Sequence, residues 1–178
     1  MKSERFSTFK RGALHAALAS TAVLGGLGLV GNAHAISGDA TATVVQAIDI
    51  TQNRALNFGK FVASNGGTVT LTNVATTVVG GTSVRVSPST AASGQFTVTG
   101  DGAATYTLTA DASTTITDGN TTMNVTAITP SVTTGGVLSG TSGSQGSQVV
   151  YVGATLTQGA ANAAGTYSGT YSITVAYN

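Results

Sequence analysis

The chain has 178 residues, a formal net charge of +1, 24 glycines and no cysteine or tryptophan. Only 7% of its residues are charged, which is too few to neutralise a phosphate backbone and makes nucleic acid a poor partner. Without cysteine the folded domain has no disulfide, so its stability must come from packing.

The first 35 residues have the pattern of a cleavable secretory signal peptide. A basic start precedes an apolar run over residues 13–30, and Ala33-His34-Ala35 supplies the small-x-small pattern for cleavage after Ala35. The alternative is an uncleaved membrane anchor, which needs about 20 strongly apolar residues. Because polar residues and glycines dilute this run, we expect export to the periplasm, cell surface or extracellular space, without membrane insertion after cleavage.

Residues 36–178 then form one domain that has lost both histidines and the only glutamate. Three cations (Arg54, Lys60 and Arg85) and five aspartates remain, giving a net charge of −2. Without His or Cys the usual zinc sites, Cys–His pairs and Ser–His triads cannot form. We therefore expect no enzyme activity, no catalytic residue and no cofactor.

The aspartates could in principle bind calcium, which takes carboxylate and carbonyl oxygens as ligands. Asp101, Asp111 and Asp118 are the candidates, but no D-x-D-x-D loop is present. Asp101 and Asp118 directly precede glycines, so turn formation explains both of them. We assign no metal site.

Short alternating runs separated by Gly, Asn and Asp fill the rest of the chain, without a helical period. The expected strands lie in the runs Ala40–Thr51, Leu56–Val62, Thr68–Val74, Val84–Val86, Phe96–Val98, Tyr106–Leu108, Thr114–Thr117, Thr121–Ile128, Val149–Leu156 and Gly165–Asn178. Asp118-Gly119-Asn120 predicts a hairpin turn, whereas Thr133–Ser147 is rich in Gly, Ser and Thr and is expected to form a long flexible loop. This spacing predicts an all-β fold, an immunoglobulin-like antiparallel β-sandwich of about nine or ten strands.

The final run has the most regular alternation in the chain. One face carries Gly165, Tyr167, Gly169, Tyr171, Ile173, Val175 and Tyr177, and the other carries hydroxyl residues and alanine. Side chains alternate along a strand, so the apolar face must pack against either its own domain or a neighbouring subunit.

Five segments carry a resemblance to a known family: ATATVVQAIDIT, LNFGKF, FTVTG, VGATLT and GTYSGTYSITVAYN. Their order and spacing resemble domain of unknown function 4402, which occurs in secreted proteins of Gram-negative bacteria. The resemblance runs from about Ala40 to Asn178 and implies no particular activity.

The C-terminus is also similar to that of chaperone–usher pilins and spore-coat-U-like subunits, with Tyr177 penultimate and Gly165 fourteenth from the end. This resemblance implies that the final strand is paired first by a periplasmic chaperone and then by a donor strand from an identical or related subunit. The implied donor is Ala40–Ile50, with Val44, Ile48 and Ile50 inserting.

Two features depart from that pattern. The chain lacks the disulfide of many pilins, and Val45, Gln46 and Ala47 interrupt the alternation of the donor. The first strand of a self-sufficient sandwich has the same appearance. We therefore expect a fimbrial-like structural or adhesion subunit, with a free-standing secreted module that binds glycan or surface polymer as the alternative.

Overall fold

The computed structural model describes residues 34–160 and 162–178, so all but the last two residues of the predicted signal peptide lie outside it. The chain divides between Ala40 and Thr41 into two units, and every strand belongs to the second. In these described residues no helix is long and apolar enough to cross a bilayer.

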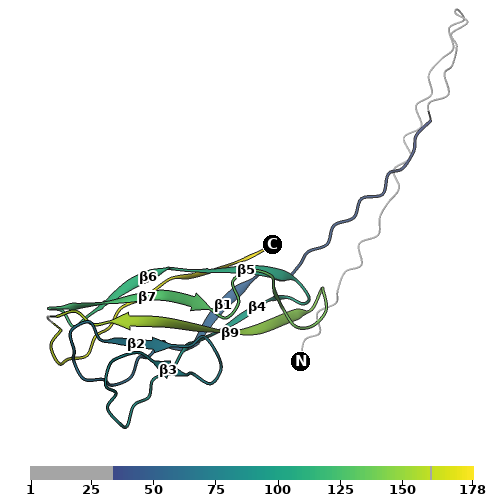
Figure 1. The fold of residues 1–178 in the computed structure, drawn as a ribbon. Helices are drawn as coiled ribbons and strands as arrows, with labels where there is room; N and C mark the ends of the chain where they lie inside the picture. Colours follow the sequence, from purple (N-terminus) through teal and green to yellow (C-terminus); the bar gives the residue numbers. More distant parts are fainter. Residues whose placement is uncertain (1–33, 161) are drawn as a thin grey trace, which may run out of the picture. The chain divides into compact units, whose positions relative to one another are not determined.

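The second unit consists of antiparallel strands (Figure 1). Their bounds are β1 (Asp49–Arg54), β2 (Thr68–Leu71), β3 (Val79–Gly80), β4 (Gly94–Asp101), β5 (Thr105–Ala110), β6 (Ser113–Thr117), β7 (Thr122–Pro130), β8 (Gly136–Val137), β9 (Gln145–Thr157) and β10 (Ile173–Tyr177). The predicted antiparallel β-sandwich is confirmed.

β9 is the central strand of the larger, seven-stranded sheet. Its first half pairs with β4, from Gln145 to Val152, and its second half lies between β2 and β7. β1 forms the edge beyond β4, β3 the edge beyond β2, and β6 the edge beyond β7.

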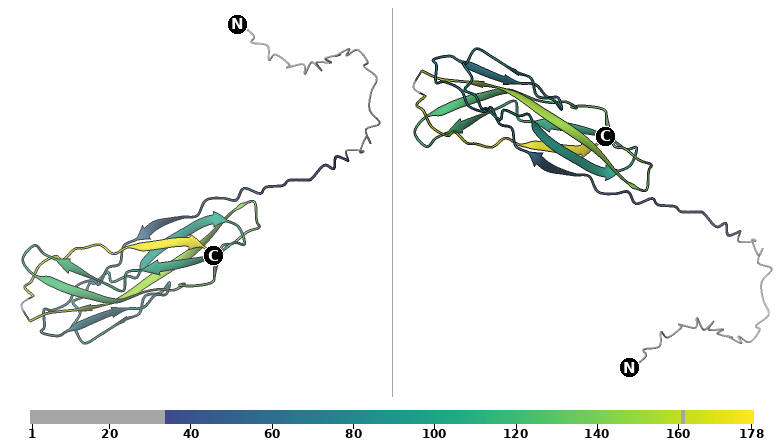
Figure 2. Two further views of the ribbon diagram at one scale, coloured as in Figure 1. Left: turned by 90° about the horizontal axis from the view of Figure 1, so that it is seen from above. Right: turned by 90° about the horizontal axis from the view of Figure 1, so that it is seen from below.

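The smaller sheet contains three strands in the order β10-β5-β8. Figure 2 shows β10, in yellow, alongside β5 on one face of the sandwich. β10 is therefore an edge strand of the smaller sheet, as β1 is of the larger one.

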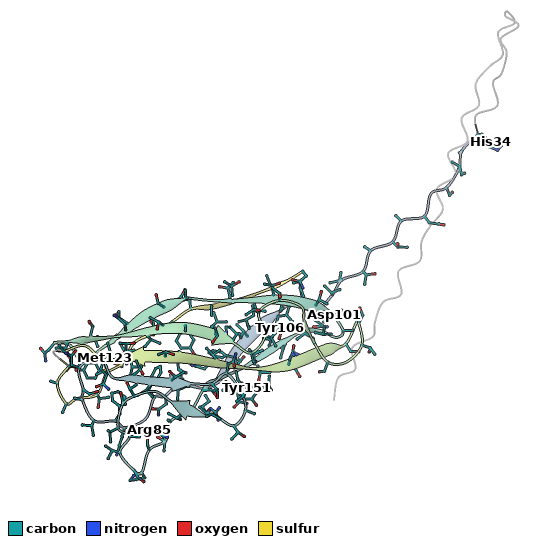
Figure 3. All side chains as sticks on the ribbon, in the orientation of Figure 1. His34, Arg85, Asp101, Tyr106, Met123 and Tyr151 are labelled. Carbon is teal, nitrogen blue, oxygen red and sulfur yellow. The ribbon has the colours of Figure 1, made fainter. Side chains whose placement is uncertain are left out.

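Side chains between the two sheets form two buried clusters that meet at Ile50 and Ile173. Alternate residues of β9 contribute to both, because Val150, Val152, Ala154 and Leu156 are at most 2% exposed. The first cluster includes Met123 and the second includes Tyr106, and Figure 3 shows these two residues in opposite halves of the sandwich.

The predicted hairpin around Asp118-Gly119-Asn120 is confirmed, since β6 and β7 pair from Thr117↔Thr122 onward. Gly119 has a φ of 96°, a conformation that glycine adopts without steric cost.

The expectation of a long flexible loop over Thr133–Ser147 is wrong. This segment contains β8 and the start of β9, and Leu138 is 1% exposed within the second cluster. The Gly, Ser and Thr content of the segment suggested a loop without core contacts, but one residue, Leu138, packs in the core and holds the segment in place.

Replacing Leu138 by alanine tests this correction. We expect Leu138→Ala to lower the free energy of unfolding by about 2–5 kcal/mol, because it leaves a cavity in the second cluster. Val137→Ala is the matched control: Val137 is 52% exposed, so its truncation should stay within about 0.5 kcal/mol. Equal effects in urea unfolding would contradict the assignment of Leu138 to the core.

Candidate functional site

The predicted assembly strand alternates as expected in its exposure. Its odd-numbered residues Tyr167, Tyr171, Ile173, Val175 and Tyr177 are half-buried, and the even-numbered residues from Ser168 to Asn178 are exposed. Regular pairing covers only the last part: β10 pairs with β5, and the segment before it runs beside β6.

The backbone groups of this segment are used on one side only. Ser168 exchanges two backbone hydrogen bonds of 2.9 Å with Thr117. On the same side of the segment, the Asp111 N–H donates to the Ser172 carbonyl and the Asn178 N–H donates to the Thr105 carbonyl. In an antiparallel pair alternate residues bond to the same neighbour, so the N–H and C=O groups of the odd-numbered residues point towards the opposite edge.

A groove separates this edge from β1 and the segment that follows it. Its larger cavity has a volume of about 730 Å³, and a second one measures about 350 Å³. Both are lined by Ala55, Leu56, Gly169 and Tyr171, so the two cavities are neighbours.

The floor of the larger cavity is the core itself. Met123, Val125 and Leu156 line it, although each is at most 3% exposed. Leu56 and Phe58 form one wall, from the chain after β1, and residues 163–169 form the other. The groove is thus a gap between the chain that follows β1 and the chain that leads into β10, and it reaches the hydrophobic core.

Tyr171 crosses the floor of the groove. Its ring packs edge-on against Phe96, with centroids 6.3 Å apart, and a Cβ placed on Gly94 would lie 2.7 Å from its hydroxyl oxygen. This hydroxyl is buried and has no hydrogen-bond partner in the described part of the chain. Burial raises the pKa of Tyr171 to about 12.

Tyr177 lies at the far end of β10 from the groove and lines neither cavity. The backbone N–H of Asp101 donates to its hydroxyl oxygen at 2.6 Å, and the hydroxyl donates to the carbonyl of Gln46 at 2.7 Å. Ile48 packs against the second cluster together with Val175 and Tyr177. We name this the Asp101 end, and the other, where Gly165 lies beside Asp118, the Asp118 end.

The structure separates the residues that were predicted to act together. Gly165, Tyr167, Tyr171 and Ile173 line the groove, whereas Val175 and Tyr177 line neither cavity and pack against the second cluster.

The predicted donor strand is also divided. The alternating run was expected to start at Ala40, but β1 starts only at Asp49. Ile48 and Ile50 pack against the core of their own chain, while Val44 is 93% exposed. Only the part before Ile48 therefore remains outside the sandwich.

Two of the candidate aspartates, Asp101 and Asp118, accept hydrogen bonds from groups in nearby turns. Asp101 accepts hydrogen bonds from Ser142 Oγ and the Gly143 backbone, and so holds the turn before β9. Asp118 accepts from the Thr121 and Asn120 backbone N–H groups, which lower the pKa of its carboxyl. Across residues 34–160 and 162–178, no three His, Cys, Asp or Glu side chains are grouped to hold an ion.

Sequence reasoning missed the other wall and the floor of the groove. Leu56 and Phe58 alternate in LNFGKF, which indicates a strand, but the pattern does not tell which element covers them. Met123 and Leu156 were expected in strands, and their position beneath a groove depends on long-range pairing of β7 with β9.

These features define the class of protein: an antiparallel β-sandwich whose first and last strands leave a groove open to the core. The chain matches the family model described as "Domain of unknown function (DUF4402)" over residues 48–177, and it belongs to this family. The match begins at Ile48, directly before β1. No curated protein and no solved structure matched the chain.

The hydroxyls of Tyr171 and Tyr177 should have opposite effects on stability. Tyr171→Phe removes a buried group without a partner, so the free energy of unfolding should rise by up to about 1 kcal/mol. Tyr177→Phe leaves the buried Asp101 N–H unpaired and should lower it by about 1–2 kcal/mol. Urea unfolding of both variants measures the difference, and equal values would contradict the two assignments.

The pKa of Tyr171 also predicts a pH dependence. An unfolded tyrosine ionises near pH 10, whereas folded Tyr171 keeps its proton to about pH 12. Within this interval the unfolded state binds fewer protons, so the free energy of unfolding falls as pH rises. Tyr171→Phe should reduce this decline without abolishing it, because burial also raises the pKa of Tyr106. An identical slope in parent and variant would refute the prediction.

Proposed function

We propose that this protein is an exported, non-catalytic structural subunit, of fimbrial type, that assembles by accepting an extended strand in its groove. The observation that carries the proposal is the groove between the chain that follows β1 and the chain that leads into β10, with core residues as its floor. Such strand addition uses main-chain hydrogen bonds for affinity and alternate side chains for specificity.

The edges favour a strand over a small ligand. A volume of about 730 Å³ falls within the roughly 300–1,000 Å³ that is usual for small-molecule sites, so volume does not discriminate between the two. A row of N–H and C=O groups along one wall does discriminate, because an extended chain satisfies every second group in succession. A compact ligand satisfies only a few of them.

The chemistry of the walls points the same way. Leu, Phe, Ile, Tyr, Met and Val side chains line the groove together with uncharged polar ones, and Lys60 is the single charged residue among those lining the two cavities. The polar ones are Gln52, Asn57, Thr90, Thr114, Gln158, Thr166, Ser168 and Thr170. Alternating apolar side chains of an added strand would cover this surface while the other face of that strand stays in water.

Export supports the proposal from the sequence side. The basic start, apolar run and Ala33-His34-Ala35 pattern are those of a signal peptide, and the family resemblance is to secreted proteins of Gram-negative bacteria. A periplasmic chaperone that holds the groove before assembly is the partner expected from the pilin resemblance.

Blocking the groove tests the function. Leu56 lines both cavities, so Leu56→Lys places a cation between the two edges, whereas Val137→Lys adds the same charge at a 52% exposed site outside the groove. By analytical ultracentrifugation we expect concentration-dependent assembly of the chain from Ile36 and of Val137→Lys. Leu56→Lys should remain monomeric.

Thermal melting identifies a variant that has failed to fold, and Ala55→Lys is the second groove variant because Ala55 is exposed and also lines both cavities. A parent chain that stays monomeric at every concentration would overturn the proposal. That result would favour the free-standing module that binds glycan or surface polymer.

A further inference from the structure

We propose that Asn120 is an acceptor for N-linked glycosylation, taking an oligosaccharide from a polyprenyl-diphosphate donor. This inference goes beyond the assembly function and does not depend on it. The observations that carry it are the sequence Asp118-Gly119-Asn120-Thr121-Thr122, its place in an exposed turn, and two side chains there to which the fold gives no role.

The turn between β6 and β7 contains an N-x-[ST] sequon, Asn120-Thr121-Thr122, in a chain whose start has the pattern of a signal peptide. Asp118 lies two residues before the asparagine, which completes the extended form D-x-N-x-T that bacterial oligosaccharyltransferases prefer. Backbone N–H groups of Thr121 and Asn120 donate to the Asp118 carboxyl and lower its pKa. The carboxylate is therefore charged at neutral pH and can pair with a cationic group of an enzyme.

The fold accounts for Asp118 and Gly119, but not for the two residues that define the sequon. Gly119 takes the positive φ of the turn, and Asp118 accepts its hydrogen bonds. Asn120 does not have a positive φ, so the turn does not require asparagine there. Within the described part of the chain, Asn120 forms its hydrogen bond through the backbone N–H, and Thr122 bonds through backbone groups. The amide and the hydroxyl that the sequon needs are both left available.

The sequon lies on the outside of the sandwich. Gly119, Asn120 and Thr122 are exposed, and a Cβ placed on Gly119 would meet nothing within 4 Å. Figure 3 shows Met123, the next residue, towards the end of the sandwich away from Asp101. A hairpin turn of this kind opens locally at low free energy, so an enzyme can hold it in an extended form without unfolding the core.

A second N-x-[ST] sequon, at residues 124–126, lies inside β7. The side chain of Asn124 is also exposed, but the residue pairs with Thr115 of β6 on one side and Thr157 of β9 on the other. The residues directly before and after it are at most 3% exposed. An enzyme cannot lift this sequon out without breaking the larger sheet and the first cluster. Asn124 is therefore a control for sequence without an accessible backbone.

The transfer joins the Asn120 amide to the first sugar of the donor. The amide nitrogen attacks C1 of that sugar, a bond between C1 and the nitrogen forms, and the bond from C1 to the diphosphate oxygen breaks. The diphosphate leaves with the bonding electron pair on its polyprenyl carrier, and the amide nitrogen loses one proton. The step therefore needs neither an oxidant nor a reductant.

A glycan on Asn120 leaves the groove open. Neither Asn120 nor Thr122 lines either cavity. The turn is nevertheless tied to the wall of the groove, because Thr121 Oγ1 lies 2.6 Å from the Tyr167 hydroxyl oxygen and Asn162 Nδ2 donates to the Thr122 carbonyl at 2.9 Å. The glycan therefore stands beside the Asp118 end, outside the cavities, and glycosylation and assembly can be tested separately.

The experiment incubates the purified, folded chain with a bacterial oligosaccharyltransferase and its polyprenyl-diphosphate-linked oligosaccharide, and measures the intact mass. We expect the mass to rise by one glycan. Cyanogen bromide, which cleaves after methionine, then locates it. Met123 is the one methionine besides Met1, so cleavage places Asn120 and Asn124 in different fragments. The glycan should be on the fragment that ends at Met123.

Four variants separate sequence from structure. Asn120→Gln and Asp118→Asn should lose the mass increase, and Asn124→Gln should keep it. Thr122→Asp removes the threonine of the first sequon and gives Asn124 an acid two residues before it. Because Asn124 lies in a paired strand, this variant should gain no glycan while it is folded, and thermal melting shows that each variant is folded.

A synthetic peptide of residues 115–123 presents the same sequon without the fold and reports whether the enzyme is active. Modification of the peptide but not of the folded chain would overturn the proposal, because the turn would then be closed to the enzyme. Failure of the peptide beside an acceptor protein that is modified would show that the sequon is not recognised. A glycan retained in Asn120→Gln, or gained on Asn124 in Thr122→Asp, would contradict the choice of Asn120 from its place in the turn.

Discussion

β9 is the constraint on which both halves of the sandwich depend. It is long enough to pair first with β4 and then with β2 along the same edge, and the change of neighbour falls at Gly153. A Cβ at Gly153 would lie 2.4 Å from the carbonyl oxygen of Leu71, so only glycine allows the chains to approach there. β1 pairs with β4 alone, and the chain after β1 forms only isolated bridges, at Asn57 and Phe61.

The groove follows from this arrangement. The smaller sheet has three strands against seven in the larger one, so side chains and irregular segments cover the rest of the core. Tyr167 and Tyr171 fill part of the gap between the edges where a further strand would lie. An uncovered strand edge beside apolar surface is a liability in a protein that remains alone. In a protein that assembles, the same edge is a binding surface, because its unpaired N–H and C=O groups can form hydrogen bonds with an added extended chain.

The alternation of apolar residues and the turn residues predicted where most strands lie, but not which strands pair with one another. The alternation of Tyr167, Tyr171 and Ile173 correctly indicated which side chains face inward, and Asp118-Gly119-Asn120 correctly located a turn. Both depend only on neighbouring residues.

The groove and the boundaries of the first strand depend instead on residues far apart in the chain. The sequence ATATVVQAIDIT reads as one run, yet only its end pairs with β4, because the Gln46 carbonyl bonds to Tyr177, 131 positions away. No window of sequence contains that contact. The same limit explains Leu138, whose burial in a Gly/Ser/Thr-rich segment depends on contact with the distant β-strands of the second cluster.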